Sequence, residues 1–202
     1  MRKQIFLLDA SLKKVKKLYF CFLACFFIFL QEAQSAEIWV MDTDLSKIEF
    51  EIPVLLAKNV KGEFLDIQGY IAIDKRNNKN NKSLFSANLN EINMNYIKYK
   101  DLLLSNIFFD TQQFPIALIE TKEFLYNNEE NINLNLELSI KGTRKIIPIT
   151  INVNQLAEEL VQIKNEFTIS RTNFNIGTKK WSNTSILKDT VKIKTNLFLF
   201  KE

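Results

Sequence analysis

Apolar and polar residues alternate along most of the chain beyond residue 37. In residues 132–140 every second side chain is apolar, and the residues between them are polar. The apolar positions are Ile132, Leu134, Leu136, Leu138 and Ile140. Because successive side chains of an extended strand point to opposite faces, this pattern predicts a β-strand with one apolar and one polar face.

The same alternation recurs in six further segments. They are residues 47–54, 66–74, 84–92, 146–153, 161–169 and 190–200. Seven or more short strands of this kind are typical of an antiparallel sandwich or barrel. Gly142, between two such segments, fits the turn of a hairpin. Residues 74–83 are rich in Asn and Lys, and we expect a solvated loop there.

Residues 96–110 interrupt the alternation. Ile97, Asp101, Leu102 and Ser105 stand at helical spacing, which predicts a short helix followed by a turn. We expect the apolar residues of this segment to pack over one end of the structure or along its wall. These residues are Leu103, Leu104, Phe108 and Phe109. They either close the core or form a moving lid, and the sequence leaves both open.

The first 36 residues have the layout of a secretory signal peptide. A basic start precedes a 13-residue apolar run, Leu18 to Leu30, and the small residues of "AQSA" follow. A membrane-spanning helix needs roughly 20 apolar residues, so the run favours a cleaved leader over an uncleaved anchor. We therefore expect a signal peptide at 1–36 and one folded domain at 37–202, with export to the periplasm.

Removing the leader changes the chemistry expected of the chain. Both cysteines, Cys21 and Cys25, lie inside the leader, so the remainder would form no disulfide. The leader also carries six of the 27 basic residues and two of the 23 acidic ones, which leaves 21 of each. A neutral remainder gives no support to nucleic-acid binding, although the whole chain has a net charge of +4.

Few residues of the remainder suggest catalysis or metal binding. The chain has no His, which excludes a Ser-His-Asp triad and His-based metal sites. Two acidic pairs, Asp42 with Asp44 and Glu158 with Glu159, lack further candidate ligands. The S-x-x-K spacing of Ser185 and Lys188 precedes a predicted strand and lacks the partner motifs that such enzymes need. We therefore expect no enzymatic activity and no metal.

Two single residues have alternative structural interpretations. Arg171 stands at the end of a predicted strand, where a buried cation acts more often as a hydrogen-bond donor than as a catalyst. Trp181 either shields the mouth of the structure or covers the core.

Several motifs together resemble the YceI-like family of polyisoprenoid-binding, lipocalin-like periplasmic proteins. "IWVMDTDLSKIEFEI" begins at Ile38, "VKGEF" at Val60, "LSIKGTRKIIP" at Leu138 and "KDTVKIKTNLFL" at Lys188. The most specific block is a helix, then "S-x-x-F-F-D", then "F-P". It is matched here by Asp101, Leu104, Ser105, Phe108, Phe109, Asp110 and Pro115. Two departures are Lys141, where the family often has His, and Asn175, an extra residue in "SRTNFNIG".

The resemblance implies an all-β fold: an eight-stranded antiparallel lipocalin-like barrel with one or two short helices. It also implies an elongated apolar pocket for a long isoprenoid or other amphiphilic lipid, with a quinone-like ligand as one form and no cofactor. Transient contact with a membrane is compatible with this role, and the oligomeric state is left open.

A barrel of about eight strands is just wide enough to hold either its own side chains or one small ligand. We therefore hypothesise that the chain sequesters or carries a lipid. The alternative is a non-catalytic, structural or stress-related barrel that binds a partner and has a filled core. A third class, an enzyme that uses Asp, Glu and Lys, would require clustered carboxylates in a cleft.

The predicted ligand-binding residues are apolar positions on the inward faces of the alternating segments. They are Phe50, Ile52, Phe64, Ile71, Leu89, Leu134, Leu136, Leu138, Ile149, Ile151, Ile163, Phe167 and Leu197.

The leader generates the first testable prediction. We expect export with cleavage close to residue 36, because the basic start, the apolar run and "AQSA" follow in the order that signal peptidase recognises. N-terminal sequencing of the protein recovered from cells should begin near Glu37. A membrane-bound chain that still begins near Met1 would contradict the prediction.

Overall fold

The computed structural model describes residues 36–55, 58–127 and 129–202. The predicted signal peptide, apart from Ala36, therefore lies outside the described residues. None of the helices in the described part of the chain is long and apolar enough to cross a membrane.

The described residues form one antiparallel sheet with short helical turns between some strands. The strands are β1 (Glu37–Met41), β2 (Lys47–Ile52), β3 (Val60–Phe64), β4 (Ile67–Ile73), β5 (Lys82–Asn88), β6 (Ile92–Met94), β7 (Ile116–Lys122), β8 (Asn131–Ile140), β9 (Thr143–Ala157), β10 (Leu160–Ser170) and β11 (Thr190–Lys201). The helical elements are α2 (Lys100–Leu104) and the 3₁₀ turns η1 (Asn78–Asn80), η2 (Ile97–Tyr99), η3 (Thr172–Phe174) and η4 (Lys179–Ser182).

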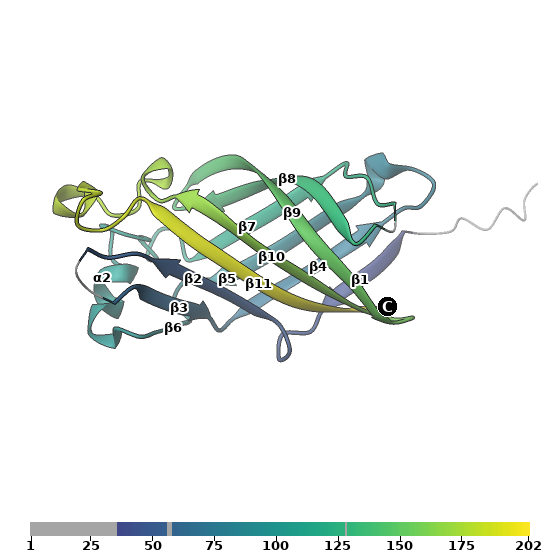
Figure 1. The fold of residues 1–202 in the computed structure, drawn as a ribbon, viewed down its shortest axis with the longest axis horizontal. Helices are drawn as coiled ribbons and strands as arrows, with labels where there is room; N and C mark the ends of the chain where they lie inside the picture. Colours follow the sequence, from purple (N-terminus) through teal and green to yellow (C-terminus); the bar gives the residue numbers. More distant parts are fainter. Residues whose placement is uncertain (1–35, 56–57, 128) are drawn as a thin grey trace, which may run out of the picture. The chain divides into compact units, whose positions relative to one another are not determined.

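Eight strands close into the barrel that the resemblance implied. Their order is β1-β4-β5-β7-β8-β9-β10-β11, and β11 pairs again with β1 (Figure 1). Residues 192–196 of β11 pair with β2, and residues 199–201 pair with β1. The strands β2, β3 and β6 thus extend the wall beyond the closed ring.

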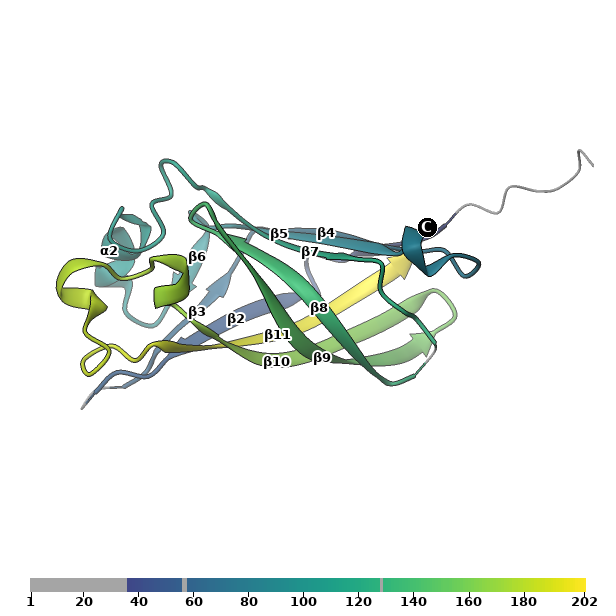
Figure 2. The ribbon, with the colours of Figure 1, turned by 90° about the horizontal axis from the view of Figure 1, so that it is seen from above.

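The two ends of the barrel differ. At one end lie α2, η2, η3, η4 and the connection between β2 and β3, and we call this the cap end (Figures 1 and 2). At the other end lie η1, the β7–β8 connection, the β9–β10 turn and the C-terminus, and we call this the far end (Figures 1 and 2).

The wall contains a seam between β9 and β10. Their ladder joins residues 152–157 of β9 to residues 160–164 of β10 and ends there, although both strands are fully described. Beyond that point β9 continues paired with β8, and β10 continues paired with β11. The side-chain nitrogen of Asn165 donates a hydrogen bond across the seam to the carbonyl of Thr150.

The inward face of the barrel is mostly apolar, as the alternation predicted. In β8 the side chains of Ile132, Leu136, Leu138 and Ile140 are buried, and Leu134 is half-buried. The buried residues form two clusters: one is centred on the cap-end half and includes Phe108 and Phe174, and the other includes Trp39 and Leu199.

Two glycines let phenylalanine rings lie flat against the wall. Gly62 is paired with Phe50, and Gly69 is paired with Phe85 on the neighbouring strand. A Cβ atom on Gly69 would lie 2.1 Å from the Phe85 ring, and one on Gly62 would lie 2.4 Å from the Phe50 ring. Each ring therefore takes the space that a side chain on its glycine partner would occupy.

Two sequence-based predictions need correction. Residues 84–92 form two strands rather than one, because a turn at residues 89–91 separates β5 from β6. The loop at residues 74–83 is not wholly solvated, because Asn81 is buried and donates to the carbonyl of Phe124.

The glycine–phenylalanine pairs generate a stability prediction. Gly69→Ala should lower the free energy of unfolding by about 1–3 kcal/mol, because the new methyl group overlaps the Phe85 ring and forces it out of its position. Thermal unfolding measures the loss, and Gln68→Ala, at the neighbouring exposed position, is the control. Adding Phe85→Leu to Gly69→Ala should recover part of the loss. Equal stability of Gly69→Ala and wild type would show that the ring does not need this space.

Candidate functional site

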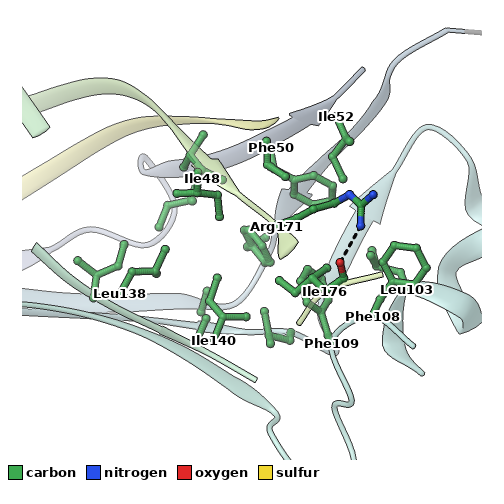
Figure 3. Close-up of a pocket in the computed structure, with 18 of the residues that line it drawn as sticks. Ile48, Phe50, Ile52, Leu103, Phe108, Phe109, Leu138, Ile140, Arg171 and Ile176 are labelled. Atoms are coloured by element: carbon green, nitrogen blue, oxygen red, sulfur yellow. Dashed lines mark hydrogen bonds between the residues drawn. The ribbon is translucent and has the colours of Figure 1, made fainter. Parts of the chain in front are cut away.

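An apolar cavity occupies the cap-end half of the barrel (Figure 3). Its volume is about 80 Å³. Apart from Ser86 and Arg171, the described residues that line it are apolar. They come from the inner faces of the strands and from the cap segment that contains Leu103, Phe108 and Phe109.

A second cavity, also of about 80 Å³, occupies the far-end half. It is lined by residues of β2, β4, β5, β7, β8, β9, β10 and β11 and by Phe124 of the β7–β8 connection. Four residues line both cavities: Ile48, Phe85, Ile119 and Phe167. The two cavities are therefore neighbouring parts of one lumen, which this ring of side chains narrows.

A groove of about 310 Å³ opens at the cap end. It shares Ile52, Leu103 and Phe108 with the cap-end cavity. Trp181 stands on its wall, with its ring edge-on to Phe108 at a centroid distance of 5.8 Å. Groove and cavities thus follow one another along the barrel, and Trp181 both borders the mouth and packs against the core.

All thirteen predicted ligand-binding residues line the lumen. Six line the cap-end cavity: Phe50, Ile52, Phe64, Leu89, Leu138 and Phe167. The far-end cavity has Phe167 again together with Ile71, Leu134, Leu136, Ile149, Ile151, Ile163 and Leu197. Their inward orientation agrees with the alternation, and their contact with a ligand remains a prediction.

The sequence reasoning missed other lining residues. Phe85 and Ile193 follow the same alternation and could have been included. Ile119 lies in β7, where "IALIETK" does not alternate, so its orientation carried no signal. In the cap segment, Leu103, Phe108 and Phe109 are buried as expected, whereas Leu104 is half-buried and lines none of these three hollows.

Polar side chains also line the far-end cavity, at inward positions where the alternation alone predicts apolar residues. Asn165 and Thr195 occupy inward positions of β10 and β11 and face each other as a cross-strand pair. The side-chain oxygen of Asn165 is buried and has no hydrogen-bond partner among the described residues. A hydroxyl group of a ligand, or a water molecule, would satisfy it.

Arg171 is a structural anchor beneath the cap, as its position at a strand end suggested. It is fully buried and donates to the backbone carbonyls of Lys188 (3.0 Å), Ile176 (2.8 Å) and Leu187 (2.7 Å). Figure 3 shows the bond to Ile176 beside the cavity. Burial lowers the pKa of the guanidinium, and Asp189 opposes this shift. Arg171 thus connects β10 to both halves of the β10–β11 connection.

Lys141 joins three segments at the same end. Its ammonium group donates to the carbonyls of Asn106 (2.7 Å) and Asn175 (2.9 Å), so the β8–β9 turn is tied to the cap and to the residues after η3. Partial burial lowers the pKa of Lys141, and Asp110 opposes this shift. Asn175, the extra residue of its motif, has a φ of 55° and supplies one of these carbonyls.

The candidate metal and enzyme motifs do not assemble into a site. Asp42 accepts hydrogen bonds from the amides of Asp44 and Leu45, which makes it a turn residue. Glu158 and Glu159 lie exposed in the β9–β10 turn. Ser185 is exposed in the loop before β11. Within the described ranges, no three acidic, His or Cys side chains gather in a way that could hold a metal ion.

Comparison with known proteins places the sequence in a family. Residues 39–199 match the family model of the YceI-like domain. A comparison with curated proteins gives no match.

Solved structures of similar fold include BcnA of Burkholderia cenocepacia, with a TM-score of 0.70 and 21% identity, covering 78% of this chain and 98% of BcnA. A polyisoprenoid binding domain from Saccharophagus degradans, implicated in plant cell wall breakdown, has a TM-score of 0.67 and 15% identity. The match covers 81% of this chain and 98% of that domain. The YceI protein of Campylobacter jejuni has a TM-score of 0.62 and 20% identity, and the match covers 74% of this chain and 89% of that protein.

The Arg171 anchor generates a prediction about the cap. Arg171→Lys should lower the free energy of unfolding by roughly 2–5 kcal/mol, because one ammonium group cannot reach all the carbonyls that the guanidinium holds. Urea denaturation measures the change. Arg144→Lys is the matched control, since Arg144 is exposed and pairs with Glu137 at 3.4 Å. Equal, small effects of both substitutions would show that Arg171 does not anchor the cap.

Proposed function

The chain belongs to the family of YceI-like domains, and from this premise we propose that it binds a long apolar lipid chain inside its barrel. The proposal rests on the arrangement of three mostly apolar hollows along the barrel. The cap-end cavity shares lining residues with the cap-end groove on one side and with the far-end cavity on the other.

The shape and chemistry of the lumen favour a slender, chain-like ligand. The two cavities, each of about 80 Å³, lie below the roughly 300–1,000 Å³ of common small-molecule pockets. The side chains shared by the two cavities narrow the lumen between them, which favours a narrow isoprenoid or acyl chain over a bulky ring system. Each buried CH₂ group contributes about 0.8 kcal/mol, so a long chain gains substantial binding energy from desolvation alone.

Binding is supported over catalysis by what lines the lumen. Among the described residues, Arg171 is the charged side chain of the two cavities, and backbone carbonyls hold its guanidinium. No general base or nucleophile pair stands beside it in the described lining. The proposed role is sequestration or carriage of a lipid tail, and the leader predicted at 1–36 supports the periplasm as its place.

The competing function is a barrel filled by its own side chains that binds a protein partner through its surface. The small volume of each cavity favours this alternative. The two functions differ in what a charge in the lumen would do, because an open lumen lets a flexible Lys extend towards water and a filled one does not.

Leu136, 3% exposed on the far-end cavity, is the residue at which to test this difference. Leu136→Lys should abolish lipid binding while circular dichroism still shows a folded barrel. Asn135→Lys, whose side chain is exposed on the neighbouring position, is the control and should retain its lipid. The measurement is solvent extraction of each purified protein followed by mass spectrometry of the extract.

Each other outcome has a definite meaning. Wild-type protein that yields no lipid would contradict the proposal, as would a folded Leu136→Lys variant with its full lipid content. If wild type carries no lipid and Leu136→Lys loses several kcal/mol of stability, the filled barrel is supported, because an unpaired charge has been buried in it.

A further inference from the structure

The cap end carries a cluster of lysines. Three segments meet there: residues 53–60, of which the structure describes 53–55 and 58–60, residues 95–104 and residues 178–188. The bridge between Val54 and Leu187 joins the first segment to the third, and the Tyr96 hydroxyl donates to the carbonyl of Lys58, which joins the first to the second. In sequence these segments contain one acidic residue, Asp101, and six lysines: Lys58, Lys98, Lys100, Lys179, Lys180 and Lys188.

The far end has the opposite charge balance. Its connections, residues 74–81, 123–130, 157–159 and 201–202, contain four basic residues and seven acidic ones. The acidic residues are Asp74, Glu123, Glu129, Glu130, Glu158, Glu159 and Glu202. Because the chain after residue 36 is neutral overall, this asymmetry gives the barrel a positive cap end and a negative far end.

Exposed apolar side chains lie among the cap-end lysines. Leu55 and Ile186 are 53% and 49% exposed, and the Leu55 amide donates to the Ile186 carbonyl. Ile97 and Tyr99, on the second segment, are 67% and 45% exposed. Exposed apolar residues also occur on the wall and at the far end, but at the cap end Tyr99 and Ile186 line the groove that leads into the lumen. Leu55 and Ile97 are chain neighbours of residues that line the same groove.

Two lysines at this end lie beside aromatic rings. The Lys98 ammonium is 5.1 Å from the centroid of the Tyr99 ring, and the Lys180 ammonium is 5.4 Å from that of the Trp181 ring. Tyr and Trp favour the boundary between apolar and aqueous phases, and lysines at such a boundary reach the charged groups of the surface.

We propose that the cap end is a docking surface for an anionic lipid bilayer. Leu55, Ile97 and Ile186 insert among the head groups, the six lysines contact lipid phosphates, and the groove opens towards the membrane. Charge complementarity selects the occupant: an apolar patch alone would suit a protein partner, whereas a lysine-rich patch on a barrel with no net charge suits an anionic surface. The inference rests on the proposed function, since it gives the lipid tail a route from bilayer to lumen.

The test is flotation of the purified, leader-free protein with vesicles of phosphatidylcholine, with and without added phosphatidylglycerol. We expect binding to the anionic vesicles that weakens as salt is added and is far weaker on neutral ones. The double variant Lys98→Gln/Lys180→Gln should bind about 30-fold more weakly, at roughly fivefold for each lysine near an anionic surface. Lys79→Gln/Lys164→Gln, with both lysines exposed away from the cap end, is the matched control.

The apolar contribution is tested separately. Leu55→Ser/Ile97→Ser/Ile186→Ser should lose binding to anionic vesicles. Leu125→Ser/Leu156→Ser, at positions 59% and 51% exposed at the far end, should not. Equal binding by cap-end and far-end variants would overturn the docking surface. The docking surface would also be overturned if sedimentation showed that the free protein is a dimer and that only the cap-end substitutions dissociate it.

Lipid extraction separates this proposal from the one it rests on. Wild type that carries lipid but ignores anionic vesicles would overturn the docking surface and leave lipid binding intact. Wild type that carries no lipid would contradict the proposed function, whatever its behaviour on vesicles.

Discussion

Closure of the sheet by β11 is the constraint on which the rest of the structure depends. One strand pairs with β10 along its whole length and, on its other edge, with β2 and then β1. Once the sheet has closed on itself, no second layer can cover its inner face. The inward side chains and the cap must therefore fill the interior themselves, and what they leave unfilled becomes the lumen.

The sequence predicts the parts of this arrangement that depend on local order. The alternation of residues 132–140 identifies β8 and the inward direction of Leu136, because side chains of a strand must alternate. It cannot identify features that depend on distant partners. The carbonyls that accept hydrogen bonds from Arg171 lie at residues 176–177 and 187–188. In β7 the apolar and polar residues do not alternate, because Ala117 and Ile119 share its inner face with the polar Thr121.

The cap is held by cations and carbonyls rather than by covalent links. Arg171 and Lys141 together reach carbonyls in two separate connections, the one between α2 and β7 and the one between β10 and β11. The chain has no cysteine after residue 36, so no disulfide can hold these connections there. Such bonds are strong because one partner is charged, yet they can break and re-form without a redox reaction. The cap is therefore held firmly, and its attachment to the barrel is reversible.

The seam between β9 and β10 makes the barrel wall mechanically compliant. Moving residues 143–151 away from β10 breaks the side-chain bond from Asn165 to Thr150 but no ladder hydrogen bond between these two strands, so the circumference can grow there more easily than across any fully paired neighbour. An unpaired strand edge ordinarily invites a second chain to add to it, with aggregation as the result. β9 carries Arg144, Lys145 and Pro148 along this edge, residues that discourage such pairing, and Pro148 has no amide hydrogen to offer. The unpaired edge of β9 can therefore let the wall widen without promoting aggregation through the addition of a second chain.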